Sequence, residues 1–244
     1  MALDKSNVLI MVPAFNEQES VGAVLDNLLH HQFHVLLISD GSTDATARLG
    51  RARGVKVLEL PINLGVGGAL RAGFKFARRH DYKAVVQVDA DGQHPADEIE
   101  NLIRTANEQN AHMVIGSRFL SDDATLKVKG FRRLAMRVLS RSATSAANIP
   151  VTDSTSGFRI ICEPLLEQFS VHFANNYLGD TYESVISAGR AGYKIVEIPA
   201  ALMPREHGES TASTGSAVRF TLKGLGVAFL GLHKKLHPST SVDD

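Results

Sequence analysis

The fold is decided by the stretch Ala84-Val85-Val86-Gln87-Val88-Asp89-Ala90-Asp91-Gly92-Gln93-His94. Its first five residues are almost all apolar, which is typical of a strand that is covered on both faces, as in a parallel sheet. Two carboxylates, Asp89 and Asp91, follow where the strand enters a loop. Mg²⁺ and Mn²⁺ favour oxygen ligands and are commonly held by one or two carboxylates together with substrate phosphates. The stretch therefore indicates a metal site that grips a diphosphate, although an isolated Asp-x-Asp pair in a loop usually just faces water.

The same alternation of apolar strand and amphipathic helix extends outward through the first 120 residues. We predict strands at Val8–Val12, Val35–Ser39, Val55–Leu60, Ala84–Val88 and Met113–Gly116, and helices at Glu19–His30, Ala45–Arg53, Gly67–Arg79 and Ala96–Asn107. This order predicts an α/β fold with one doubly wound, mostly parallel sheet flanked by helices. The ligand crevice of such a sheet lies at the carboxyl ends of its strands.

The second half of the chain is less regular. It indicates a basic helix near Gly130–Ala147, a loop over Asp153–Arg159, a helix near Thr181–Ala191 and a strand near Lys194–Ile198. Neither an internal repeat nor a low-complexity linker divides the chain. We therefore expect one domain over residues 1–215, followed by a basic amphipathic helical tail over residues 216–244.

Composition narrows the classes of function. Lys and Arg together number 26, and so do Asp and Glu, so the formal charge is zero and a nucleic-acid partner is not expected. Cys162 is the single cysteine, so no internal disulfide can form, as suits a reducing cytoplasm. Since the N-terminus lacks the pattern of a signal peptide and no run approaches ~18 apolar residues, we expect no membrane-spanning segment.

Polar motifs follow the first three predicted strands as well. Val12-Pro13-Ala14-Phe15-Asn16-Glu17 follows the first, and Asp40-Gly41-Ser42-Thr43-Asp44 follows the second. Asp40 could accept hydrogen bonds from a base edge or a ribose hydroxyl, or it could simply shape a turn. Backbone amides of the glycine-rich loop Asn63–Gly68 could approach an anion. Leu70 stands where a dinucleotide fingerprint needs its third glycine, so close packing of this loop on its helix is favoured.

Together these motifs resemble one family. In addition to those above, the chain carries Gly116-Ser117-Arg118-Phe119, Asp153-Ser154-Thr155-Ser156-Gly157-Phe158-Arg159 and Arg205-x-x-Gly208-x-Ser210. Seven motifs in this order, from Val8 to Ser210, are similar to the family 2 glycosyltransferases. The nearest relatives resemble the polyprenyl-phosphate sugar synthases of the dolichyl-phosphate mannose synthase type.

The resemblance implies a GT-A fold and a role for each matching residue. The pocket for the nucleotide base and ribose would contain Pro13, Ala14, Glu17 and Asp40. The divalent metal, Mg²⁺ or Mn²⁺, would be held on the donor diphosphate by Asp89, Asp91 and Gln93. The acceptor phosphate would be bound by Arg118 and one of Arg132 and Arg133. Arg205 would close over the diphosphate, and Asp153 would lie near the reacting centre, so that the catalytic set is Asp91, Asp153 and Arg205.

The chemistry of sugar transfer agrees with these roles. Charge builds on the departing diphosphate, and a metal ion with an arginine stabilises that charge. A phosphate monoester has its second pKa near ~6, so such an acceptor is already an ionised nucleophile at neutral pH. A general base is then less necessary, and Asp153 and Glu183 are the candidates if one is used. Glu183 suits the N-terminal dipole of a helix equally well, and His94 is expected to form hydrogen bonds beside the metal.

Two cationic or amphipathic stretches suggest contact with a membrane surface. Six cations and no acid lie between Lys127 and Arg141, and Arg133, Arg137 and Arg141 share a helix face. In the tail, an apolar stripe consists of Val218, Leu222, Leu225, Phe229, Leu232 and Leu236. The basic stripe either rests on anionic headgroups or is solvated, and the tail is either an interfacial or partner helix or is docked on the core. We expect a peripheral enzyme on the cytoplasmic face of the membrane, with a small membrane protein or a second copy as its partner.

The predicted function is that of an inverting, metal-dependent glycosyltransferase. It would move a sugar from a nucleotide diphosphate sugar to undecaprenyl or dolichyl phosphate, for the assembly of surface polysaccharide or glycoconjugates. The alternatives are a transferase that uses a saccharide hydroxyl and a catalytically silent protein that binds nucleotide sugars. Cation density around Arg118 and Lys127–Arg141 favours a phosphate acceptor. The sequence leaves the sugar and the base open.

Overall fold

The computed structural model describes residues 2–120, 140–141, 143–146, 149–173, 180–201 and 235–237. The strands are β1 (Val8–Ala14), β2 (His34–Asp40), β3 (Lys56–Leu60), β4 (Ala84–Gln87), β5 (Met113–Ser117), β6 (Arg159–Cys162) and β7 (Ile195–Pro199). The helices are α1 (Val21–His30), α2 (Thr46–Ala52), α3 (Val66–Arg79), α4 (Asp97–Gln109), α6 (Leu165–His172) and α7 (Asp180–Arg190). Each element predicted in the first 120 residues is present, with ends shifted by two residues at most.

The strands form one seven-stranded sheet in the order β3-β2-β1-β4-β6-β5-β7. All neighbours are parallel except β6, which runs antiparallel to both β4 and β5. The mixed α/β sheet is confirmed, but the predicted loop over Asp153–Arg159 ends one residue early because Arg159 begins β6. Strand β6 and helix α6 were not predicted, because their four and eight residues are too few to show a clear period of their own.

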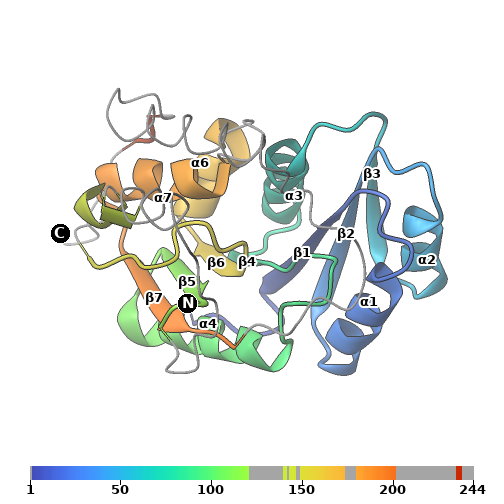
Figure 1. The fold of residues 1–244 in the computed structure, drawn as a ribbon, viewed down its shortest axis with the longest axis horizontal. Helices are drawn as coiled ribbons and strands as arrows, with labels where there is room; N and C mark the ends of the chain where they lie inside the picture. Colours follow the sequence, from blue (N-terminus) through green and yellow to red (C-terminus); the bar gives the residue numbers. More distant parts are fainter. Residues whose placement is uncertain are drawn as a thin grey trace, which may run out of the picture.

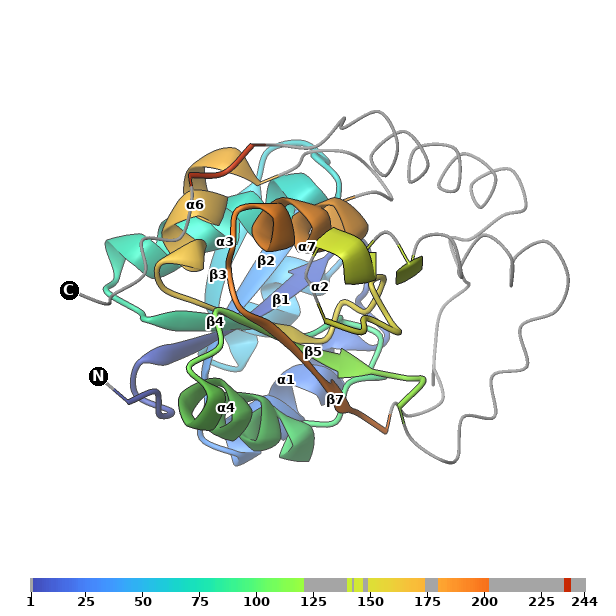
Figure 2. The same ribbon diagram turned by 90° about the vertical axis from the view of Figure 1, so that its left-hand side faces the viewer.

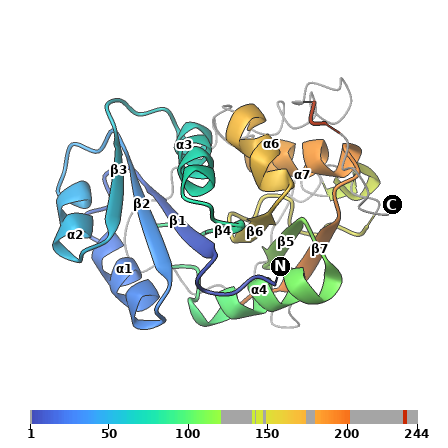
Figure 3. The same ribbon diagram turned by 180° about the vertical axis from the view of Figure 1, so that it is seen from behind.

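Helices cover both faces of the sheet (Figures 1 and 3). One core cluster joins the sheet to α1 and α4, and a second joins its other face to α3, α6 and α7. Figure 2 shows α4 and α7 on opposite sides of β7. All described side chains of β1 except Pro13, and all those of β4 and β5, are buried. This two-sided burial explains why these strands are continuous apolar runs.

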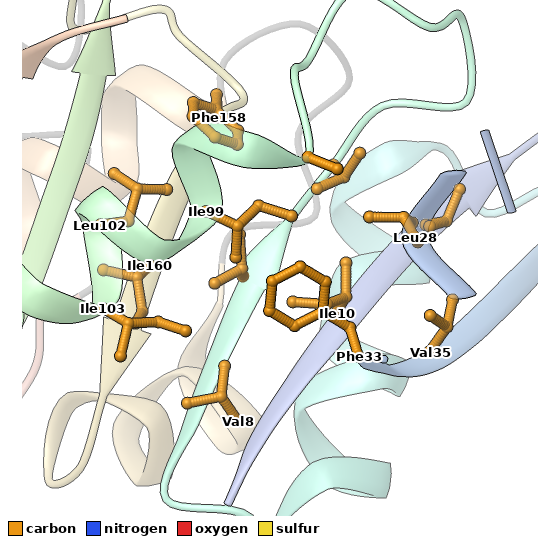
Figure 4. Close-up of a cluster of buried hydrophobic side chains, with 14 of the residues drawn as sticks. Val8, Ile10, Leu28, Phe33, Val35, Ile99, Leu102, Ile103, Phe158 and Ile160 are labelled. Carbon is orange, nitrogen blue, oxygen red and sulfur yellow. The ribbon is translucent and has the colours of Figure 1, made fainter. Parts of the chain in front are cut away.

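The first core cluster extends beneath the predicted site. Ile10 and Val8 of β1 meet Leu28 and Phe33 in this cluster, and Figure 4 shows them beside α4 residues. Phe158, which directly precedes β6, is fully buried in the same cluster. The loop before β6 is therefore anchored in the core at the point where it enters the sheet.

The reversed direction of β6 determines which loops meet. Ile115 of β5 and Gln87 of β4 both pair with Arg159, the first residue of β6. The amino end of β6 therefore lies at the same sheet edge as the carboxyl ends of β4 and β5. The loop that contains Asp153 is thereby placed beside the residues that follow β4 and β5.

Residues 235–237 return to the domain. Leu236 packs against the second core cluster, and the backbone N–H of His237 donates to Gln168 Oε1 of α6 at 3.2 Å. This contact favours the docked interpretation for the end of the tail, while the other members of its apolar stripe lie outside the described residues. Within the part of the chain that the structure describes, no helix has the length and apolar character to span a bilayer.

Candidate active site

The loops after β1 and β2 are joined by reciprocal hydrogen bonds. The N–H of Asn16 donates to Ser42 Oγ at 3.1 Å, and the N–H of Thr43 donates to Asn16 Oδ1 at 2.9 Å. The N–H of Glu17 donates to Thr46 Oγ1 at 2.9 Å, while the Glu17 carboxylate accepts from Ser20 Oγ at 2.9 Å. Pro13 and Ala14 form the last two positions of β1, opposite Ile38 and Ser39. The loop after β1 is therefore tied to the loop after β2, and Pro13 and Ala14 belong to the strand that leads into it.

Asp40, the last residue of β2, is buried and supports the next loop. Its Oδ1 atom accepts the N–H of Leu64 at 2.8 Å. Burial raises the pKa of Asp40 above its ordinary value. Gly41 has φ +71°, and a Cβ there would lie 2.5 Å from the backbone N of Asn63. The Asp40 carboxylate thus supports the loop after β3, beside a tight turn at Gly41, and its contact with a base or ribose stays a prediction.

The glycine-rich loop packs closely, as predicted. A Cβ at Gly68 would lie 2.5 Å from Leu64 Cβ, so only glycine lets the start of α3 approach this loop. Large apolar side chains are nevertheless exposed along this sheet edge, namely Phe15, Ile62 and Leu64. Exposed apolar surface beside a buried carboxylate is suited to the flat face of a ligand ring.

Asp89 and Asp91 follow β4 at the same edge. Asp91 is buried, and its Oδ1 accepts the N–H of Gln93 at 3.1 Å. Asp89 has a side chain that is 41% exposed, and its Oδ1 accepts from Gln87 Nε2 at 3.3 Å. Gln87 was not among the predicted site residues, although a polar residue within an apolar strand was a usable signal. Hydrogen bonds therefore hold both predicted carboxylates in place, and the side chain of Asp89 is accessible to a ligand.

His94 holds the backbone of Asp89 in place. Its Nδ1 atom accepts the backbone N–H of Asp89 at 2.9 Å, and Nε2 lies 3.8 Å from Asp89 Oδ2. Burial lowers the pKa of His94, which favours the neutral ring that this hydrogen bond requires. The ring also packs on Phe158, with centroids 5.0 Å apart. The predicted hydrogen bonding of His94 beside Asp89 is confirmed.

The donor set suits a divalent metal that shares its ligands with a substrate. Among the described residues, no group of three or more His, Cys, Asp and Glu side chains could hold a metal. Asp89, Asp91 and Gln93 instead offer oxygen ligands from one short loop, as in Mg²⁺ sites that are completed by phosphate and water. Gly157 keeps space around them, because a Cβ there would lie 3.0 Å and 3.1 Å from the two carboxylate oxygens of Asp89.

Arg118 and Asp153 form an ion pair at the end of β5, which we call the Arg118–Asp153 pair. Arg118 Nε donates to Asp153 Oδ2 at 2.6 Å, and Nη2 donates to Oδ1 at 2.8 Å. The Asp153 side chain is completely buried, whereas that of Arg118 is 30% exposed. Hydrogen bonding to Asp153 raises the pKa of Arg118. Two residues that were predicted separately, one for the acceptor phosphate and one for catalysis, are therefore bonded to each other.

Two side chains to which no role was assigned from the sequence, the buried Arg159 and the partly buried Glu197, hold the surrounding loop. Arg159 binds the carbonyl of Ser156 and donates to Ser184 Oγ of α7 at 2.7 Å. Glu197 of β7 accepts the N–H groups of Thr152 and Asp153, each at 2.7 Å. Glu183 is buried in the first turn of α7, as the dipole interpretation expects. Apart from the local contact between Arg159 and Ser156, these pairs are 25 to 45 residues apart in sequence, so no local pattern predicts them.

Three predicted site residues, Arg132, Arg133 and Arg205, lie outside the described residues. A cavity of about 240 Å³ lies between α1 and the loop after β4. Asp91, Gly92 and His94 line one wall, and Ala23 and Asn27 of α1 line another. Of the predicted donor-side residues, Asp91 lines this cavity, whereas Pro13, Glu17 and Asp40 do not.

Comparisons with known proteins agree with this geometry. Residues 9–169 match the family model described as Glycosyl transferase family 2. The chain is 30% identical over 225 residues to the polyprenol monophosphomannose synthase of Mycolicibacterium smegmatis, with 86% of this chain and 82% of the relative covered. It is 29% identical to the undecaprenyl-phosphate mannosyltransferase of Micrococcus luteus, with 94% and 98% covered.

Solved structures with the same fold include glucosyl-3-phosphoglycerate synthase from Mycobacterium tuberculosis, crystallised with Mn²⁺, UDP and glucosyl-3-phosphoglycerate. That structure superposes with a TM-score of 0.67 at 19% identity, and the match covers 91% of this chain and 79% of that one. The likeness confirms the GT-A architecture that the motif resemblance implied.

Proposed function

Because the chain belongs to glycosyl transferase family 2 and is a glycosyltransferase, we propose that it moves a sugar from a nucleotide diphosphate sugar to a polyprenyl phosphate. The observation that carries this proposal is that Asp89 and Arg118 follow β4 and β5 at the same edge of the sheet, where both strands end beside the amino end of β6. A carboxylate for the metal and a guanidinium for a phosphate are the two groups that the reaction needs. The names of the relatives from M. smegmatis and M. luteus support the same acceptor class.

The donor side would consist of the loops after β1, β2 and β4. Pro13, Ala14, Glu17 and Asp40 would bind the nucleoside, and Arg205 would close over the diphosphate. Asp89, Asp91 and Gln93 would hold Mg²⁺ or Mn²⁺, which when bound neutralises the negative charge that collects on the diphosphate. The neighbour crystallised with Mn²⁺ and UDP supports use of a divalent metal. The hydrogen bonds between the loops after β1 and β2 would fix the nucleoside relative to the carboxylates of Asp89 and Asp91.

The acceptor side would consist of Arg118, one of Arg132 and Arg133, and the loop before β6. A phosphate oxygen forms a bond to the anomeric carbon while the bond from that carbon to the diphosphate breaks, and the electron pair leaves with the nucleoside diphosphate. Attack from the opposite face inverts the anomeric centre. No proton has to be removed, since the acceptor is already ionised near neutral pH.

The setting of the reaction follows from this acceptor. A polyprenyl phosphate lies in a bilayer, so the enzyme would work as a peripheral protein on its cytoplasmic face and supply lipid-linked sugar for surface polysaccharide or glycoconjugates. Basic residues from Lys127 to Arg141 would attract anionic headgroups. A small membrane protein or a second copy of the chain would complete attachment.

The test is a screen of radiolabelled GDP-mannose, UDP-glucose and UDP-N-acetylglucosamine against undecaprenyl and dolichyl phosphate, with and without EDTA. We expect label to enter the lipid phase with one donor and EDTA to abolish its entry. Transfer only to added saccharides would replace the proposal with the hydroxyl-acceptor alternative. Donor binding without transfer to any acceptor would favour a silent binding protein.

A further inference from the structure

We propose that Asp153 is a positioning residue for Arg118 and does not serve as the general base. In this role, the Asp153 carboxylate holds one edge of the guanidinium so that its other edge faces the acceptor phosphate. This inference rests on the proposed function, because it assumes a phosphate acceptor. Arg118 would then bind the acceptor phosphate, and the buried Asp153 would orient the guanidinium.

The hydrogen bonds of Asp153 leave it no capacity to take a proton from a substrate. Its Oδ2 atom accepts from the backbone N–H of Arg118 at 3.2 Å and from Nε at 2.6 Å. Its Oδ1 atom accepts from Nη2 at 2.8 Å and from Thr155 Oγ1 at 3.1 Å. A carboxylate offers about four lone-pair sites, so all of them are occupied. The side chain is also completely buried, which keeps an acceptor from reaching it.

Arg118, in contrast, keeps unused donors. Nε and Nη2 bind Asp153, and Nη2 also donates to Thr155 Oγ1 at 2.9 Å. Nη1 forms no hydrogen bond to any residue that the structure describes, and the side chain is 30% exposed. Two N–H groups of a fixed guanidinium match the geometry of a phosphate. Since Asp153 compensates one positive charge, a second cation such as Arg132 or Arg133 would still be needed for a dianion.

The backbone of Asp153 is itself held by Glu197. Glu197 of β7 accepts the N–H of Asp153 at 2.7 Å, and it accepts both the N–H and the hydroxyl of Thr152. Thr152 Oγ1 is also 2.8 Å from Ser117 Oγ at the end of β5. Arg118 is thus held by a chain of contacts that begins on the edge strand. Such support suits a residue that must present donors in one orientation.

Binding is tested with farnesyl phosphate, a short isoprenoid phosphate, by isothermal titration calorimetry of the full chain. We expect Asp153→Asn and Arg118→Ala each to weaken its affinity about 10- to 100-fold, the range for a lost hydrogen bond to a charged group. Thr155→Val, which removes the hydrogen bond to Asp153 Oδ1 and the one from Arg118 Nη2, should cause a smaller loss in the same direction. Arg78→Ala removes an exposed ion pair with Glu163 and Glu167 and serves as the control. Farnesol, which lacks the phosphate, should show no difference among the variants.

Turnover with undecaprenyl phosphate then separates positioning from base catalysis. A positioning role predicts a raised acceptor KM in Asp153→Asn and a kcat within about tenfold of the unmodified enzyme at saturating acceptor. Added guanidinium chloride should partly restore Arg118→Ala, and it should fail to restore Arg118→Ala with Asp153→Asn, because the carboxylate that would seat the ion is gone.

Two results would overturn the inference. One is an unchanged affinity for farnesyl phosphate in a folded Asp153→Asn variant, and the other is a lost kcat with an unchanged acceptor KM, which would make Asp153 the base. If Asp153→Asn does not fold, an unchanged affinity in Thr155→Val would count against the inference in the same way. An unmodified enzyme that neither binds farnesyl phosphate nor uses undecaprenyl phosphate would instead refute the proposed function.

Discussion

Asp91 is the residue on which the proposed chemistry depends most directly. It is buried at the start of the loop after β4, and its carboxylate already accepts one backbone N–H, from Gln93. We expect Asp91→Ala to lower turnover about 100-fold or more, because the charge on the departing diphosphate would lose one of its supports. The measurements are the initial rate of sugar transfer and the binding of Mn²⁺ followed by electron paramagnetic resonance.

The control for Asp91→Ala is Asp26→Ala, which removes an exposed carboxylate paired with Arg53. It should leave both the transfer rate and Mn²⁺ binding unchanged. A folded Asp91→Ala variant with near-normal transfer would refute the metal assignment.

Gly157 makes a second prediction at the residue scale. A Cβ there would lie within 3.0–3.1 Å of both Asp89 carboxylate oxygens and of Gln87 Nε2. Gly157→Ala should therefore displace the Asp89 carboxylate by a few tenths of an ångström, weaken Mn²⁺ binding and slow transfer, while the thermal midpoint changes little. Gly54→Ala serves as a control for adding a methyl group away from the site, because a Cβ there meets nothing within 4 Å. Its backbone φ of +71° makes that variant strained. Equal Mn²⁺ affinity in Gly157→Ala and the unmodified enzyme would contradict the expected displacement.

At the scale of elements, α1 and α4 are joined through His31 and Asp97. His31 Nε2 lies 2.7 Å from Asp97 Oδ1, and Nδ1 lies 2.9 Å from the carbonyl of Asn27. The Asn27 carbonyl and then Asp97 raise the pKa of His31. A raised folded-state pKa means that protonated His31 stabilises the fold below the unfolded pKa of about 6.5, and that this stabilisation is lost as the pH rises through the folded-state pKa.

We therefore expect His31→Gln to reduce the free energy of unfolding at about pH 5.5 and to have little effect at about pH 8.5, on either side of the histidine pKa range. Urea unfolding at the two pH values measures this difference. Asp97→Asn should reproduce much of the pH dependence. A stability loss that is the same at both pH values would show that the ion pair does not contribute.

Helices α3 and α6 are joined by an aromatic cluster. The Phe74 ring centroid lies 5.8 Å from that of Phe169 and 5.0 Å from that of Phe173. Phe169→Ala should lower the free energy of unfolding by about 3–5 kcal/mol, because it leaves a cavity between the two helices. Phe169→Leu should cost less. Urea unfolding gives both values, and a loss below about 1 kcal/mol for the alanine variant would mean that the cluster collapses around the gap.

The elements also show what the sequence could and could not predict. The long strands and helices of the first half were predictable, since continuous apolar runs and helical periodicity are local signals. β6 was not, because a four-residue strand inserted between β4 and β5 depends on partners distant in sequence. The same holds in the site: the position of Asp89 and Asp91 follows from the end of one strand, whereas the Arg118–Asp153 pair joins residues 35 apart.

At the scale of the whole molecule, the end of the tail is fastened to the catalytic domain. Leu236 packs against the core cluster shared by α3, α6 and α7. Leu236→Ala should lower the free energy of unfolding by about 1–2 kcal/mol, in proportion to the apolar area it returns to water. Val171→Ala, at a side chain that is 56% exposed, should cause almost no change in urea unfolding. Equal stability of the two variants would indicate that the tail end is not bound in solution.

The reversed strand β6 has a consequence for how such enzymes diversify. Apart from Arg205, every residue proposed to bind the donor lies within residues 1–94, whereas the end of β5 and the loop that leads into β6 would bind the acceptor. A hybrid chain could keep residues 1–94 and take the remainder from a relative. It should show most of the nucleotide preference of this chain and the recipient preference of the relative. The antiparallel strand β6 would thus let the preferences for recipient and nucleotide evolve at different rates.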